Sequence, residues 1–168
     1  EAAEHFIIAE LTALTPDIPV IAEELAAAGK LPSVTNRFWM VDPLDGTKEF
    51  VKRNGEFTVN IALLHQGFPI MGVVYAPVLD WMYWGNREIG AWKQEGKEVP
   101  KRLNEVTGAA IKTIVASRSH MNQKTTDFIA KYPQAEVVSI GSSIKFMLVA
   151  ENKAQLYPRF GPTMEWDT

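Results

Sequence analysis

Asp42 and Asp45 stand close together in the segment Asp42-Pro43-Leu44-Asp45-Gly46-Thr47, directly after an apolar stretch. Proline disfavours helical geometry at the residue before it, so we expect Asp42 in an extended conformation. Gly46 permits a tight turn with a positive φ. The turn can therefore bring the two carboxylates and the Leu44 carbonyl oxygen to one side, where oxygen donors suit a hard cation such as Mg²⁺.

The residues that follow this turn are suited to hold an anion. Gly46 and Thr47 begin a short helix that we expect over residues 48–53, and backbone N–H groups at a helix start can receive a phosphate. Metal-assisted hydrolysis of a phosphate ester requires at least a cation site next to an anion site. Asp-Pro and Asp-Gly are also common turn formers, so the segment by itself fits an ordinary loop equally well.

Two further acidic pairs are candidate metal ligands. Glu23 and Glu24 follow an apolar run, and Glu165 and Asp167 flank a tryptophan. Each pair has a simpler interpretation, because acidic residues favour a helix N-terminus and an aspartate can cap a helix. Two metal ions would nevertheless need several carboxylates from separate parts of the chain, so both interpretations stay open for each pair.

Composition narrows the classes of function. The net charge is −3, from 17 basic and 20 acidic residues, which argues against a broad electrostatic grip on nucleic acid but leaves room for a local anion pocket. Without cysteine there is no disulfide framework and no thiolate metal site. No apolar run approaches the roughly 20 residues that span a bilayer, and no signal peptide is recognised. We therefore expect a cytoplasmic protein without an integral membrane segment.

The elements that must position these residues alternate between helix and strand. Apolar residues at helical spacing predict a first helix that ends at Thr15-Pro16, with an apolar face made of Ala3, Phe6, Ile7, Leu11 and Leu14. Apolar runs and period-two alternation predict strands at 18–22, 38–41, 57–63, 69–76, 81–84, 90–93, 113–116, 137–138 and 154–157. Further helices are expected at 122–131 and 144–150, and polar loops at 26–37 and 97–112. This pattern predicts layered α and β structure with a mixed sheet.

Residues 39–50 resemble the first signature of the inositol-monophosphatase superfamily, and Trp166-Asp167 resembles the start of its second. Glu23-Glu24 is similar to the acidic pair of that family. Residues 52–63, 141–146 and 156–162 resemble the branch of CysQ-type 3′(2′),5′-bisphosphate nucleotidases, and the likeness runs through the whole chain in order. It implies a layered αβαβα sugar-phosphatase-like fold, incomplete at both termini. Residues 1–100 would carry the metal site, and residues 101–168 the nucleotide contacts.

The resemblance also implies roles for individual residues. Glu23, Asp42 and the Leu44 carbonyl would bind one Mg²⁺, and Asp42, Asp45 and Asp167 another, within a site for two or three ions. Thr47 resembles the threonine that orients the attacking water and would act in catalysis with Glu23 and Asp45. The implied substrate-binding residues are Gly46, Thr47, His120, Gly141, Ser142, Lys145 and Asp167, with Arg159 as a further cation that could also pair with a carboxylate.

The implied reaction is hydrolysis of 3′-phosphoadenosine 5′-phosphate to AMP and phosphate by a metal-activated water. It would place the protein in sulfur metabolism, in the cytoplasm or at the periphery of the inner membrane, and would make it sensitive to Li⁺. The sister activities on inositol monophosphate or fructose 1,6-bisphosphate remain alternatives, as does a non-catalytic metal- or nucleotide-binding fragment. The chain starts at Glu1 without methionine, and the family aspartate that works with Thr47 would lie upstream. We therefore expect a fragment with weak or no activity, of unknown oligomeric state.

Overall fold

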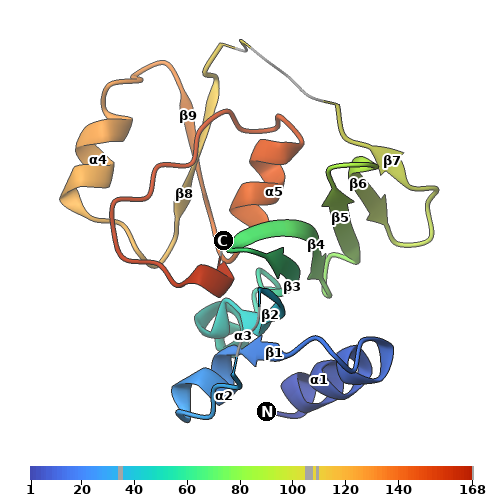
Figure 1. Ribbon diagram of the computed structural model, residues 1–168. Coiled ribbons are helices and arrows are strands. Elements are labelled where there is room, and N and C mark those ends of the chain that lie inside the picture. Colours follow the sequence, from blue (N-terminus) through green and yellow to red (C-terminus); the bar gives the residue numbers. More distant parts are fainter. Residues whose placement is uncertain (34–35, 105–107, 109, 168) are drawn as a thin grey trace.

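The structure, a computed structural model, describes residues 1–33, 36–104, 108 and 110–167 and contains two sheets (Figure 1). Parts of the loops expected at 26–37 and 97–112 lie outside the described residues. The larger sheet has seven strands in chain order, with β1 parallel to β2 and every later neighbour antiparallel. Its strands are β1 Val20–Ala22, β2 Arg37–Asp45, β3 Thr58–His65, β4 Phe68–Ala76, β5 Trp81–Asn86, β6 Gly90–Glu95 and β7 Lys101–Arg102. The predicted mixed sheet is confirmed.

The meander forms because short turns join neighbouring strands. Gln66 and Gly67 connect β3 to β4 with φ of 51° and 79°. Positive φ at both central residues is the hairpin turn whose twist matches that of the flanking strands. The turn predicted at Gln66-Gly67 is therefore confirmed, and it sets β4 antiparallel to β3 along its whole length.

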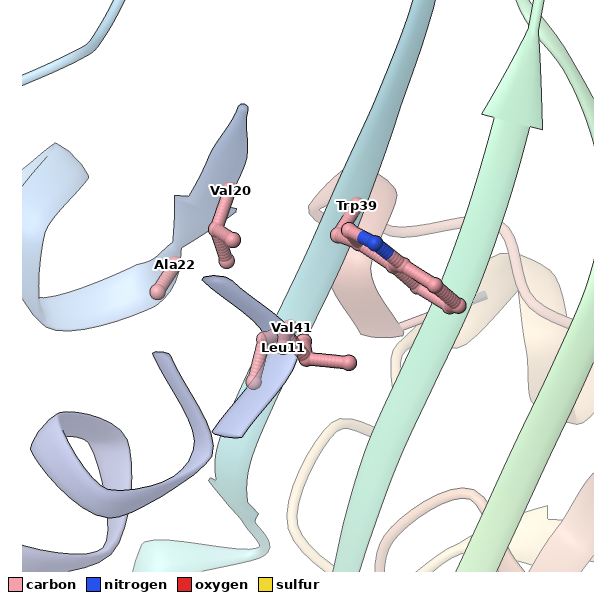
Figure 2. Close-up of a cluster of buried hydrophobic side chains, with 5 residues drawn as sticks. All are labelled: Leu11, Val20, Ala22, Trp39 and Val41. Atoms are coloured by element: carbon pink, nitrogen blue, oxygen red, sulfur yellow. The ribbon is translucent and has the colours of Figure 1, made fainter. Parts of the chain in front are cut away.

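Helix α1, Ala2–Leu14, packs on β1 and β2 and builds a small core there. Leu11 from the helix meets Val20, Ala22, Trp39 and Val41 from the two strands (Figure 2). Trp39 also donates its indole N–H to the Thr15 hydroxyl over 2.9 Å, so the end of the helix is tied to the sheet.

The predicted apolar face of α1 is only partly correct. Phe6 and Leu14 are 67% and 75% exposed, whereas Glu4 is 2% exposed. The Glu4 carboxylate accepts the backbone N–H of Glu24 over 2.8 Å at the start of helix α2, Glu23–Ala27. Because of this contact, the face of α1 that carries Glu4 and Leu11 packs against the rest of the protein. Phe6 and Leu14 therefore lie on the exposed face of the helix.

The second sheet pairs β8, Thr113–Ser117, in parallel with β9, Glu136–Ile140. Helix α4, Gln123–Ile129, connects them, as a parallel pair requires a crossover. Helix α5, Ile144–Ala150, follows β9 and lies between the two sheets (Figure 1). Across the described residues, no helix has the length and apolarity that a membrane crossing requires.

The strand predicted at 154–157 is wrong. This segment makes only an isolated bridge between Leu156 and Ile114, supported by the backbone bond from Val115 N–H to the Leu156 carbonyl. Pro158 follows at once and has no N–H to donate, so the ladder cannot continue.

Candidate metal and phosphate site

The site begins at the end of β2, where the register against β3 shifts between Asp42 and Asp45. Asp42 is 1% exposed, and its Oδ1 accepts the Leu44 N–H over 2.9 Å. Gly46 has φ of 91° and precedes helix α3, Thr47–Lys52. A Cβ at Gly46 would lie 3.0 Å from the Glu56 carbonyl oxygen and 3.1 Å from the Ser142 Cβ, so the chain is closely packed at this turn. The tight turn predicted here is confirmed.

Three carboxylates converge beside this turn. One oxygen each from Asp42, Asp45 and Asp167 lie within 4.8 Å of one another. Asp167 belongs to the short 3₁₀ helix η1, Glu165–Asp167, which contacts β2 although it is far away in the sequence. The two signatures noted in the sequence therefore meet in space.

Glu23 lies beside this cluster at the first position of α2, and its carboxyl group shares a hydrogen bond with Asp42. Burial raises the pKa of Asp42 to about 8, and the nearby Glu23 and Asp45 charges add to the rise while the Leu44 N–H opposes it. Burial also raises the pKa of Glu23 and of Asp45, and in each case the Asp167 charge raises it further. Each of the four acidic groups therefore makes ionisation of its neighbours less favourable, in a space from which water is partly excluded.

A divalent cation fits this donor set. In the described part of the chain, no Lys or Arg forms an ion pair with Glu23, Asp42, Asp45 or Asp167. Buried carboxylates without a protein cation are costly unless a metal ion neutralises them. Carboxylate and carbonyl oxygens are the ligands that Mg²⁺ prefers, and the Leu44 carbonyl adds one at the cavity wall.

Basic groups lie across the same cavity, which has a volume of about 560 Å³. Lys145 is 4% exposed, and burial lowers its pKa. Burial also lowers the pKa of His120, followed by the charges of Arg159, Lys48 and Lys145. The Nε of Arg159 is buried without a hydrogen-bond partner among the described residues. One cavity is thus lined both by acidic groups, which suit cations, and by basic groups, which suit anions.

The structure brings every predicted site residue to this cavity. Its lining includes Glu23, Asp42, Leu44, Asp45, Gly46, Thr47, His120, Gly141, Ser142, Lys145 and Asp167. Their individual roles stay predictions.

One buried acid in the cavity was not predicted. Glu49 is 4% exposed and accepts the Ser119 hydroxyl over 3.0 Å. A Cβ at Gly141 would lie only 2.5 Å from the Glu49 Cγ. A glutamate in a short helix gives no sequence signal of burial, because the packed face depends on the neighbouring segment 141–142.

Fold and site together define a phosphatase-like protein with an acidic ion cluster, and the chain belongs to the inositol monophosphatase family. The profile of the Inositol monophosphatase family matches residues 1–168. Among curated proteins, the chain is 54% identical to the 3′(2′),5′-bisphosphate nucleotidase CysQ of Salmonella typhimurium over 169 residues, covering 100% of this chain and 68% of that protein. The corresponding CysQ of Escherichia coli K12 is 51% identical over the same share of both chains.

Solved structures agree with this assignment. CysQ from Bacteroides thetaiotaomicron, described as a bacterial member of the inositol monophosphatase family, superposes with a TM-score of 0.77 at 42% identity, over 93% of this chain and 65% of that chain. An inositol monophosphatase family protein of Staphylococcus aureus superposes with a TM-score of 0.78 at 20% identity, over 99% of this chain and 60% of that one, and supports the fold alone. The chain spans about two thirds of the length of the CysQ relatives. The predicted layered sugar-phosphatase-like fold is confirmed.

Proposed function

We propose that this chain carries the active centre of a Mg²⁺-dependent phosphomonoesterase that hydrolyses 3′-phosphoadenosine 5′-phosphate to AMP and phosphate. The convergence of Asp42, Asp45 and Asp167 within 4.8 Å is the observation that carries the proposal. The naming of relatives at 54% and 51% identity as bisphosphate nucleotidases supports the choice of substrate. A cytoplasmic location and a small-molecule partner are part of the same proposal.

Five residues would hold the ions, namely Glu23, Asp42, Leu44 through its carbonyl, Asp45 and Asp167. When bound, two or three Mg²⁺ ions supply an activated water and stabilise the negative charge that develops on the ester oxygens. Asp42 would belong to the ligand sets of two ions, because its carboxyl group lies near Glu23 and near Asp45 and Asp167.

Thr47 and Glu23 would handle the attacking water. The Thr47 hydroxyl donates to the Leu44 carbonyl over 3.3 Å and can instead orient a water at the same position. Burial and the Asp167 and Asp45 charges raise the pKa of Glu23 in the metal-free chain, and a bound cation would offset this rise, so that Glu23 would be a carboxylate able to accept the water's proton. The water oxygen bonds to phosphorus, the phosphorus–O3′ bond breaks, and the leaving oxygen takes up a proton to become the ribose hydroxyl.

The remaining cavity residues would bind the nucleotide. Backbone N–H groups at Gly46 and Thr47 face the scissile phosphate, and Asp167 accepts a ribose hydroxyl. Lys145, His120 and the segment Gly141-Ser142 receive the rest of the nucleotide. Lys145 Nζ donates to the Ser142 carbonyl over 2.5 Å, so its position is already fixed toward this segment.

A substrate comparison tests the proposal. Phosphate release with Mg²⁺ is measured from 3′-phosphoadenosine 5′-phosphate, inositol 1-phosphate and fructose 1,6-bisphosphate. We expect release from the nucleotide to be the fastest, and its loss in Asp45→Asn but not in Asp127→Asn, which alters an exposed aspartate of α4. Faster release from either sugar phosphate would favour the sister phosphatases. If the chain binds Mg²⁺ without hydrolysis, the same assay on the chain extended at both ends separates a weakly active fragment from a non-catalytic metal-binding module.

A further inference from the structure

A buried polar cluster lies behind Asp45, outside the set of predicted site residues. Thr58 and Asn60 of β3 are 0% and 9% exposed, and Ser143 at the start of α5 is 4% exposed. Polar groups are retained at such positions only when their hydrogen bonds are made inside the protein. None of the three has a part in the proposed hydrolysis, so their purpose must be sought in what they contact.

All three residues lie against Asp45. Its Oδ2 accepts the backbone N–H of Ser143 over 2.5 Å and lies 3.3 Å from the Thr58 hydroxyl. The Asn60 side chain lies close enough to Asp45 to favour the charged form of its carboxyl group and so to lower its pKa. The Ser143 hydroxyl donates to Asn60 Oδ1 over 2.8 Å, so Ser143 reaches Asp45 both directly and through Asn60.

Each hydroxyl has only one proton to donate, and this decides which group is the donor in each hydrogen bond of the cluster. The Ser143 hydroxyl donates to Asn60 Oδ1, so the N–H₂ group is the side of the Asn60 amide that remains for Asp45, which can only accept when it is ionised. Ser143 then uses its only hydroxyl proton on Asn60. The 2.8 Å bond between the Thr58 and Ser143 hydroxyls must therefore be donated by Thr58. A relay of hydrogen bonds thus runs from Thr58 to Ser143 and from Ser143 to Asn60, beside Asp45. The Thr58 hydroxyl has no second proton for Asp45 Oδ2, which it only contacts at 3.3 Å.

The relay also reaches the substrate side of the cavity. Ser143 directly follows Gly141 and Ser142, which line the cavity, and Ser142 adopts a positive φ of 50°. A non-glycine residue in this region persists only where its surroundings hold it. The same Ser143 that fixes the Asp45 carboxylate therefore also fixes the segment that faces the substrate.

We infer that Asn60 and Ser143 are positioning residues that hold Asp45 in its metal-binding orientation and tie the ion site to the segment 141–142. The inference rests on the proposed function in taking Asp45 as a metal ligand. Groups that orient a metal ligand from behind typically change metal affinity or activity by about 10- to 100-fold when they are removed.

Two variants with matched controls test the inference on the whole chain. Ser143→Ala removes the hydroxyl but keeps the backbone N–H to Asp45, and Asn60→Ala removes the amide. The controls Ser139→Ala and Asn104→Ala make the same changes at exposed positions. Binding of Mg²⁺ is measured by calorimetry, and thermal unfolding is followed with a chelator present. We expect about 10-fold weaker Mg²⁺ binding in Ser143→Ala and a larger loss in Asn60→Ala, with unchanged affinity in both controls.

The outcomes separate this inference from the proposed activity. A lowered unfolding temperature with native Mg²⁺ affinity in Ser143→Ala would show a merely structural role and overturn the inference, as would equal weakening in Ser139→Ala. Recovery of kcat at raised Mg²⁺ would support it, because a displaced ligand weakens binding more than turnover. If the wild-type chain binds Mg²⁺ without hydrolysing the nucleotide, only the proposed function fails.

Discussion

Burial and the neighbouring carboxyl groups of Glu23 and Asp45 all raise the pKa of Asp42. The pKa of Asp42 rises from an ordinary value of 3.8 to about 8, chiefly because burial disfavours the charged form. The residue is therefore neutral at pH 7 while no cation is bound, and it must lose its proton when it becomes a metal ligand. Stability and ion binding are thus opposed at this residue.

This opposition predicts an unusual pH profile. Because the folded chain holds the Asp42 proton more tightly than the unfolded chain between pH 4 and 8, the free energy of unfolding of the metal-free chain should fall as pH rises through that window. One such group contributes up to about 1.4 kcal/mol per pH unit. Asp42→Asn keeps an acceptor for the Leu44 N–H and a donor for Glu23. We expect it to flatten the profile, to stabilise the metal-free chain at pH 8 and to abolish Mg²⁺ binding.

Urea unfolding in chelator at pH 5, 6.5 and 8 measures this difference between wild type and Asp42→Asn. Glu23 and Asp45 also have raised pKa values, so they give some slope of the same sign in both proteins. Parallel profiles for the two proteins would therefore contradict the assigned state of Asp42.

Gly141 gives a second prediction at the residue scale. A Cβ there would lie 2.5 Å from the Glu49 Cγ and 2.9 Å from the Glu56 carbonyl oxygen. We expect Gly141→Ala to cost about 1–3 kcal/mol, as overpacking does, and to weaken nucleotide binding by displacing the segment 141–142. Gly72→Ala is the matched control, because its Cβ would meet only the Ile61 carbonyl oxygen at 3.8 Å. Equal stability of both variants by urea unfolding would disprove the close approach.

At the scale of elements, α5 is fixed at both ends. Its N-terminal end is held by Asp45 and Asn60 through Ser143. At its C-terminal end, Glu151 accepts the Tyr83 hydroxyl over 2.6 Å and Lys93 Nζ over 2.9 Å. Lys93 is 5% exposed and also lies over the Trp81 ring. Helix α5 is therefore held in a fixed position between the larger sheet, β1–β7, and the cavity.

Removing the charge at the far end should therefore destabilise the chain. Burial opposes ionisation of Glu151, but hydrogen bonds from Lys153, Tyr83 and Lys93 prevail and lower its pKa, so the group is charged at neutral pH. We expect Glu151→Gln to cost about 1.5–3 kcal/mol at pH 7, because the nearly buried Lys93 loses one charged partner and keeps Glu95 at 2.7 Å. Glu98→Gln, which breaks an exposed pair with Lys101, should change stability by less than about 1 kcal/mol. Urea unfolding measures the stability of both variants. Similar small losses of stability in the two would contradict a buried network around Glu151.

At the scale of the whole molecule, the cavity lies where the β8–β9 unit meets the larger sheet. Glu56 joins the two, because it accepts the Gly141 N–H over 2.8 Å and pairs with Arg118 over 2.7 Å. The ion cluster joins them again, since Asp167 returns from the far end of the chain to β2. The division into units at residue 100 stays a prediction, and the larger sheet continues to Arg102.

An ion shared by distant segments should stabilise all of them. We expect Mg²⁺ at about 100 times its dissociation constant to raise the free energy of unfolding by about 2.7 kcal/mol. Hydrogen exchange should slow at the Asp167 amide, which bonds to the Met164 carbonyl over 3.2 Å. Asp167→Asn should lose both effects and Asp127→Asn neither. Protection by Mg²⁺ that persists in Asp167→Asn would place the ion elsewhere.

Local features of this protein could be predicted from its sequence because few residues decide them. Pro43 restricts the backbone of Asp42 before it and Gly46 permits the positive φ after Asp45, so the turn that presents Asp42 and Asp45 was predictable. The hairpin turn at Gln66-Gly67 was predictable for the same reason, since a positive φ is a local property. The order of motifs along the chain likewise indicated the family before any contact was known.

Only the tertiary structure decided which polar side chains are buried. Thr58 and Asn60 alternate with apolar residues along β3, a pattern that indicates a solvent-facing side, yet Ser143 and Asp45 cover them. Likewise, Glu4 rather than Phe6 faces inward on α1 because α2 supplies an N–H for it. Alternation and periodicity identify a face, but what packs against that face comes from segments far away in the sequence. The sequence thus specified locally the turn that carries Asp42 and Asp45, and only folding specified which distant segments surround it.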